Sequence, residues 1–199
     1  MTGGQSATRY SRSVPRTQPA DVRRDQLLDA AEAVLLEQGL RATTVAEVAQ
    51  AAGVAKGTMY LYYPSKDALL AALRARYLAR YTAALDAGGD SARDRLRRVV
   101  VALFDFGAAN HELHHLLFHE AGFSEADAFS SVRDQLEATL AAGVADGEFA
   151  IDDPALTASF LLHGVHGALV DALHQPRPAS RRRQTATALA ELVDRVVTG

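Results

Sequence analysis

The 199-residue chain has no cysteine, which excludes disulfides, thiolate zinc sites and cysteine nucleophiles. No apolar run approaches the roughly 20 residues that a membrane-spanning helix needs. The first 20 residues hold no hydrophobic segment of the signal-peptide type. No stretch alternates apolar and polar residues for long enough to predict a strand. We therefore expect a cytoplasmic, all-α protein without a membrane segment.

Charge is unevenly distributed along the chain, although its net value is only −3. Residues 1–66 hold eight Lys or Arg and six Asp or Glu, whereas residues 67–199 hold thirteen and eighteen. The low net charge argues against a protein that coats nucleic acid nonspecifically. A slightly basic head on an acidic body instead favours local contact with DNA phosphates.

Glycine and proline divide the chain into three regions. Residues 1–20 hold three arginines but little that can be buried, which predicts a disordered tail or a basic arm that follows DNA. Residues 21–66 are predicted to form a domain of three helices, and residues 67–199 a larger helical body, because apolar residues recur at spacings of three and four. The helices expected, about nine in all, are 21–38, 45–52, 55–62, 66–87, 92–108, 111–119, 125–145, 154–174 and 181–197.

Residues 44–62 predict two short helices separated by a turn at Gly53. Glycine suits the turn because residues with a Cβ rarely adopt positive φ. Two helices joined in this way form a helix-turn-helix, whose second helix enters a DNA major groove. Lys56, Thr58 and nearby tyrosines offer donors to phosphates and base edges. The same pattern also occurs in all-α proteins that do not bind DNA, so both interpretations remain open on the pattern alone.

Between residues 24 and 70, above all in TTVAEVAQAAGVAKGTMYLYYPSKDALL, the sequence resembles the tetracycline-repressor (TetR) family of bacterial regulators. The resemblance implies a non-enzymatic, homodimeric repressor without a cofactor. It implies binding to double-stranded DNA at a near-palindromic operator, and release when a small-molecule effector binds. The DNA-binding residues that it implies are Thr44, Lys56, Gly57, Thr58, Tyr60, Tyr62 and Lys66.

Two positions depart from the family's usual pattern. Ala55 stands where Ser or Thr is usual, so the second helix lacks a side-chain cap. Leu61 stands where a polar or aromatic residue is commoner. It either contacts a thymine methyl group or lies at the edge of the interface.

Beyond Leu70 the resemblance concerns architecture only. The predicted helix 154–174 is apolar on most sides and helix 181–197 along one stripe, which favours a four-helix interface between two copies of the chain. Histidines and aromatic residues concentrate in the middle of the body, as expected of a small-molecule cavity. For each of them, core packing or solvation is the alternative. The candidate ligand-binding residues are Phe104, His114, Phe118, His163 and His166.

Residues 111–115 read HELHH and match H-E-x-x-H, in which two histidines four residues apart lie on one helix face. His119 continues that face. A zinc peptidase would also need a third ligand and a substrate cleft, and five-residue matches arise by chance in a His-rich run. We therefore expect no metal site and no catalytic residue. A metal-binding sensor or metal-dependent enzyme that uses helix 111–119 is the alternative function.

Overall fold

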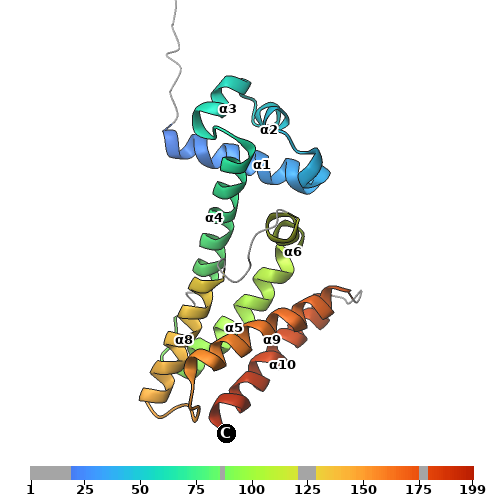
Figure 1. Cartoon of the computed structure of the whole chain (residues 1–199). Coiled ribbons are helices and arrows are strands. Elements are labelled where there is room, and N and C mark those ends of the chain that lie inside the picture. The colour runs from blue at the N-terminus through green and yellow to red at the C-terminus, as the bar shows by residue number, and fades with distance from the viewer. Residues whose placement is uncertain (1–18, 86–87, 121–128, 175–178) are drawn as a thin grey trace, which may run out of the picture.

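The computed structural model describes residues 19–85, 88–120, 129–174 and 179–199, and within these ranges all regular structure is helical. The prediction of an all-α fold is therefore confirmed. In chain order the elements are α1 (Ala20–Ala42), α2 (Val45–Ala51), α3 (Lys56–Tyr62), α4 (Lys66–Leu85), α5 (Ala92–Ala109), α6 (His111–His114), the π-helical turn η1 (His115–His119), α8 (Ser130–Ala145), α9 (Pro154–His174) and α10 (Ala179–Thr198) (Figure 1).

Two of the expected helices differ clearly from the observed ones, and the others agree or differ by at most two described residues at each end. Gly39 breaks the helical geometry at φ 79° as predicted, but the chain resumes a helical turn directly afterwards, so α1 continues to Ala42. The single helix expected over 111–119 is instead α6 followed by η1. Other expectations fall on residues that lie outside the described ones, namely 1–18, 86–87 and 125–128.

The helices form a head and a body at opposite ends of α4 (Figure 1). The head comprises α1, α2 and α3, and the body comprises α5, α8, α9 and α10. The short α6 and η1 lie beside α1, at the end of α5 that is nearer to the head. The helix α4 connects the two parts, because its first residues pack in the head and its last residues in the body.

Two clusters of buried apolar side chains correspond to these parts. The head cluster holds Leu27, Val48 and Met59, and it includes Leu113 and Leu117 from α6 and η1. The body cluster draws on α5, α8, α9 and α10. The head cluster thus continues past residue 66, where we placed a domain boundary that stays a prediction.

Ion pairs add to the contact between α1 and α4. The Arg76 guanidinium lies 2.6 Å from the Asp29 carboxylate and 2.6 Å from the Glu32 carboxylate, and Arg80 lies 3.1 Å from Glu32. The Arg76 side chain is only 14% exposed, so water screens its two pairs less than it would on an open surface. Together these contacts fix the direction in which the head leaves α4.

The loop after α8 is held to the start of α5 by the carboxylate of its own Glu148. The backbone N–H groups of Ala92 and Arg93 each donate to the Glu148 carboxylate, at 3.0 Å. These bonds lower the pKa of Glu148, and they satisfy two of the N–H groups that a helix leaves unpaired at its first turn. The next residue, Phe149, is buried against Gly143 of α8.

One described helix, α9, is long and apolar enough by length and composition to cross a membrane. The same test is passed by core helices of soluble proteins. One side of α9 is buried in the body cluster through Ala158, Leu161 and Val165. The buried share of its most apolar segment is 28%, and Leu156 and Phe160 of the same helix are exposed.

The replacement Gly143→Ala should destabilise the body, because the added methyl group would overlap the Phe149 ring. Overpacking of this kind costs about 1–3 kcal/mol, so the midpoint of urea unfolding should fall. The matched control is Gly57→Ala in α3, where the added methyl meets no atom within 4 Å. Its stability should be equal or slightly higher, since alanine favours helix over glycine. Equal midpoints for the two variants would contradict the described packing.

Candidate nucleic-acid interface and internal cavity

The helix α2 begins with a capping box formed by Thr44 and Glu47. The Glu47 backbone N–H donates to the Thr44 hydroxyl at 3.2 Å, and the Thr44 backbone N–H donates to the Glu47 carboxylate at 2.8 Å. The Thr44 hydroxyl also donates to that carboxylate, at 2.8 Å. These hydrogen bonds lower the pKa of Glu47. Thr44 thus caps α2, and it is also exposed to solvent.

The turn between α2 and α3 has the geometry that the sequence suggests. Gly53 adopts φ 66°, the positive value for which glycine is best suited. Ala55 is the residue before α3, and it provides no side-chain hydrogen bond to the helix. The N-terminus of α3 therefore has no side-chain cap, although the Thr58 backbone N–H donates to the Ala55 carbonyl at 2.9 Å.

The helix α3 has one buried anchor and one exposed face. Met59 is completely buried in the head cluster, which fixes the rotation of the helix about its axis. Lys56 and Gly57 are exposed, and Leu61 is 84% exposed. Tyr60 is 42% exposed, and its ring centroid lies 5.8 Å from the Lys56 ammonium. The Lys56 ammonium, the Tyr60 ring and the backbone at Gly57, which carries no side chain, thus lie together on the exposed face of α3.

Two basic residues on neighbouring elements complete this surface. The Arg24 guanidinium of α1 lies 5.7 Å from the centre of the half-buried Tyr62 ring. The Lys66 ammonium, at the start of α4, donates to the Leu40 carbonyl at 2.5 Å. That bond ties α4 to the end of α1, and it uses one of the three N–H donors of the ammonium group.

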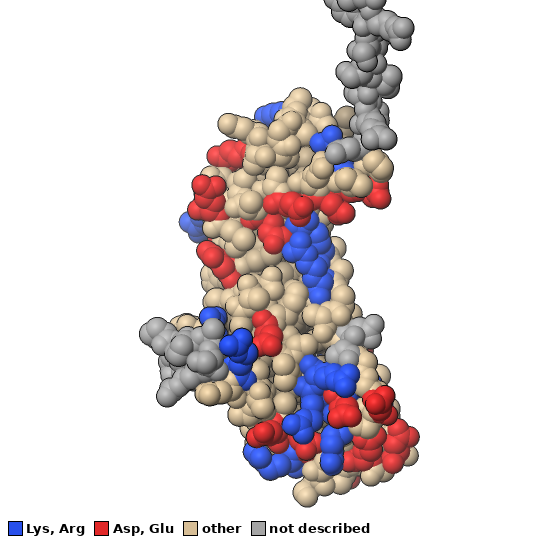
Figure 2. Space-filling model, turned by 180° about the vertical axis from the view of Figure 1, so that it is seen from behind, with Lys and Arg blue, Asp and Glu red and all other residues tan. Residues whose placement is uncertain are grey.

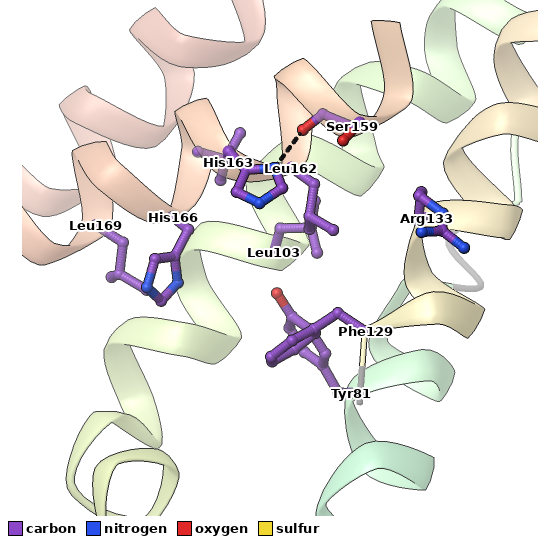
Figure 3. Close-up of a pocket in the computed structure, with 10 residues that line it drawn as sticks. Tyr81, Leu103, Phe129, Arg133, Ser159, Leu162, His163, His166 and Leu169 are labelled. Atoms are coloured by element: carbon purple, nitrogen blue, oxygen red, sulfur yellow. Dashed lines mark hydrogen bonds between the residues drawn. The ribbon is translucent and has the colours of Figure 1, made fainter. Parts of the chain in front are cut away.

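A cavity of about 350 Å³ lies in the body, where α4, α5, α8 and α9 meet (Figure 3). A smaller space of about 40 Å³ adjoins it and shares Tyr81, Phe129, His166 and Leu169 with it. Burial raises the pKa of Tyr81, so its phenol remains a hydrogen-bond donor. The larger cavity is lined by Tyr81, Leu103, Phe129, Arg133, Ser159, Leu162, His163, Val165, His166 and Leu169.

Comparison with known proteins assigns the chain to a family. Residues 27–73 match the model of bacterial regulatory proteins of the tetR family, and residues 89–169 match the tetracyclin repressor-like C-terminal domain. The HTH-type transcriptional repressor KstR2 of Rhodococcus jostii (strain RHA1) is 32% identical over 142 residues, which cover 65% of this chain and 69% of that protein. The chain belongs to the TetR family.

Solved structures agree with this assignment at the level of the fold. A TetR transcription regulator from Haloarcula marismortui matches with a TM-score of 0.76 at 23% identity, over 90% of this chain and all of that one (100%). The regulator FadR from Bacillus subtilis, in complex with stearoyl-CoA, matches with a TM-score of 0.68 at 22% identity, over 85% and 96%. The chain is a ligand-responsive, DNA-binding transcriptional regulator, and its relatives are regulators rather than enzymes.

In this TetR-family regulator, the residues predicted to bind DNA lie on or beside one face. Lys56, Gly57 and Tyr60 are exposed together on α3, and Thr58 and Tyr62 are half-buried beside them. Thr44 and Lys66 border this face but also have the intramolecular partners described above. The sequence reasoning missed Arg24, because its contact with Tyr62 depends on how α1 and α3 pack.

The residues predicted to bind a ligand are distributed over three environments. His163 and His166 line the larger cavity, and His114 lines the smaller space with its ring 6.0 Å from that of His166. Phe104 and Phe118 are buried in the body and head clusters and line neither space. The lining residues Tyr81 and Arg133 were not anticipated. No local sequence signal marks them, since each faces the cavity only through helix packing.

The His-rich segment does not assemble a metal site among the described residues. No group of three or more His, Asp or Glu side chains there is placed to hold a metal ion. His115 is exposed, with its Nδ1 atom 3.9 Å from the Glu120 carboxylate, whereas His114 is buried and stacks on Phe118. The side chain of His119 lies outside the described residues. The family assignment gives no support to the metal-dependent alternative.

The missing cap at Ala55 leads to a stability prediction. Ala55 has φ −67° and ψ 144°, the extended geometry that a capping residue adopts. Ala55→Ser should therefore raise the free energy of unfolding by about 0.5–1 kcal/mol, measured by urea denaturation. Ala55→Val, which adds bulk without an acceptor, is the control and should give no gain. Equal values for Ser and Val would show that the α3 N-terminus does not need a side-chain partner.

Proposed function

We propose that this protein is a homodimeric, cytoplasmic repressor that binds a near-palindromic operator through α3 and leaves it when a small molecule fills the body cavity. The observation that carries the proposal is the exposed face of α3, opposite the buried anchor Met59. Lys56 and Tyr60 supply donors for phosphates and base edges there. Four further residues are proposed to contact DNA from the edge of the same face: Thr44, Thr58, Tyr62 and Lys66.

Gly57 gives the most specific support for DNA contact by α3. An added Cβ at this position would meet no atom within 4 Å, so the packing of the free protein does not require glycine. A glycine inside a helix usually costs stability relative to alanine. Close approach of the α3 backbone to a DNA groove would explain why glycine stands at position 57, because a side chain there would lie between the backbone and the DNA.

The exposed sides of α9 and α10 support the homodimer. Leu156 and Phe160 of α9 are 68% and 64% exposed, and Leu192 and Val196 of α10 are 50% and 45% exposed. Exposed large apolar side chains on two successive helices favour an interface at these helices. A second copy that presents the same two helices would cover them around a two-fold axis. This partner, rather than a membrane, then accounts for the apolar outer face of α9.

Two elements are placed to carry a signal from the cavity to the head. Along α4, Tyr77 packs in the head cluster, whereas Tyr81 lines the cavity one turn later. In α6, His111 and His114 line the smaller space, and the neighbouring Leu113 packs in the head cluster. A ligand that prefers one arrangement of these helices would shift the dimer toward the spacing that does not fit the operator.

Gly57→Ala tests the placement of α3 directly. We expect weaker binding to the operator, first located by genomic footprinting, with an unfolding midpoint no lower than that of the wild type. Lys56→Ala should weaken binding to specific and nonspecific DNA alike and reduce the salt dependence by about one phosphate contact. The measurement is fluorescence anisotropy at several salt concentrations. Full operator affinity in both variants would contradict this placement of α3.

Phe160→Glu tests the proposed dimer face. A carboxylate in the centre of an apolar interface would be desolvated without a partner, so we expect dissociation to monomers and loss of operator affinity. The matched control is Val144→Glu, which also replaces an exposed apolar residue, 37% exposed, but on α8 and not on the two helices of the proposed interface. Sedimentation at micromolar concentration should show a dimer for the control. A dimer for both variants would place the interface elsewhere.

A further inference from the structure

The described wall of the larger cavity contains a positively charged side chain and no negatively charged one. Among its described lining residues there is one permanent cation, Arg133, together with His163 and His166, and there is no Asp or Glu. The other lining residues are apolar or aromatic except Ser159. A wall with this composition disfavours a cationic occupant and favours one that combines an apolar part with a negative group.

Arg133 lies on α8, across the cavity from Ser159 and His163 of α9 (Figure 3). Its side chain is 44% exposed, and it pairs at 3.4 Å with the carboxylate of Asp134, which is 66% exposed. An ion pair between two such exposed groups is weak. A carboxylate or phosphate from the cavity side would meet the guanidinium in a less solvated position and form a stronger, charge-assisted bond.

The histidine side of the cavity is less suited to an anion. The His163 Nδ1–H group donates to the Ser159 carbonyl at 2.7 Å, so this ring nitrogen already has a partner. At the smaller space, burial and the neighbouring histidines lower the pKa of His111. That space, about 40 Å³, holds about one water-sized group. The negative group therefore belongs at Arg133, with the apolar chain directed toward Leu103 and Leu169.

The volume limits the length of this chain. At roughly 30 Å³ for each water-sized group, a cavity of about 350 Å³ holds about twelve such groups. We infer that the effector is an amphipathic anion with an apolar chain of about ten carbons inside the cavity and its negative group at Arg133. The inference rests on the proposed function, since it names the ligand of the same regulator. The negative group is either a carboxylate or a phosphate monoester attached directly to the apolar chain.

The test measures binding to the full-length protein without DNA, by isothermal titration calorimetry. The probes are decanoate, decyl phosphate and the neutral decanol, all below their micelle concentrations. Arg133→Gln removes the cation and keeps a polar side chain of similar length. Arg93→Gln is the matched control, because Arg93 is also about half exposed (46%) and also contacts an aspartate, Asp194, at 3.1 Å outside the cavity.

We expect at least one of the two anions to bind wild-type and Arg93→Gln protein about tenfold more tightly than Arg133→Gln protein, with decanol unaffected by either change. Preference for decanoate identifies a carboxylate as the negative group, and preference for decyl phosphate identifies a phosphate monoester. The inference is overturned if no anion binds, if decanol binds as tightly as the anions, or if both variants lose affinity equally.

A separate anisotropy measurement adds the same probe to the protein–operator complex. If the anion binds in an Arg133-dependent way but leaves operator affinity unchanged, the ligand class is supported and the proposed release mechanism fails. If the protein binds no operator at all, the calorimetric result on the ligand still stands. The two proposals can therefore fail independently.

Discussion

The structure depends on a set of aromatic contacts around Tyr77 and Tyr81 of α4. The Tyr77 ring lies 5.4 Å from that of Phe106 and 5.5 Å from that of Phe118, whereas Tyr81 lies 4.9 Å from Phe106 and 5.5 Å from Phe129. Phe106 packs against both the head and the body clusters. Aromatic pairs at these separations add to the energy of area burial. The rings join the two clusters, and Tyr81 and Phe129 also form part of the cavity wall.

This arrangement makes the cavity and the head parts of one packed structure. A close-packed interior has few alternative arrangements, so an occupant beside Tyr81 acts on rings that also hold the head. The free energy available for this coupling is the difference between the affinities of the ligand for the two arrangements. The π-helical geometry of η1, a form found mostly as single turns at functional sites, lies on the second connection to the head.

The sequence predicts the head well because its signals are local. The position of Gly53, the end of the first regular helix at Gly39 and the absent cap at Ala55 follow from the conformational preferences of single residues. The helical turn after Gly39 was not predictable, since it depends on contacts such as that between Lys66 and the Leu40 carbonyl.

The cavity was harder to predict because residue type does not separate a core aromatic from one that lines a cavity. Phe104 and Phe118 look like ligand contacts in the sequence, but they are fully buried. Tyr81 and Arg133 line the cavity only because α4 and α8 pack around α5 and α9. The histidines at 163 and 166 were identified by type, and their position on α9 brings both to the wall.

The ion pairs between α1 and α4 also affect the electrostatic potential of the head. Figure 2 shows acidic and basic side chains meeting where the head joins the rest of the molecule. Asp29 and Glu32 would otherwise leave uncompensated negative charge on a domain that approaches polyanionic DNA, but Arg76 and Arg80 lie against them. Charges separated by more than about 8 Å are screened at physiological salt, so such neutralisation must be local. The connecting helix α4 thus supplies two cations that neutralise acidic side chains of α1 in the head.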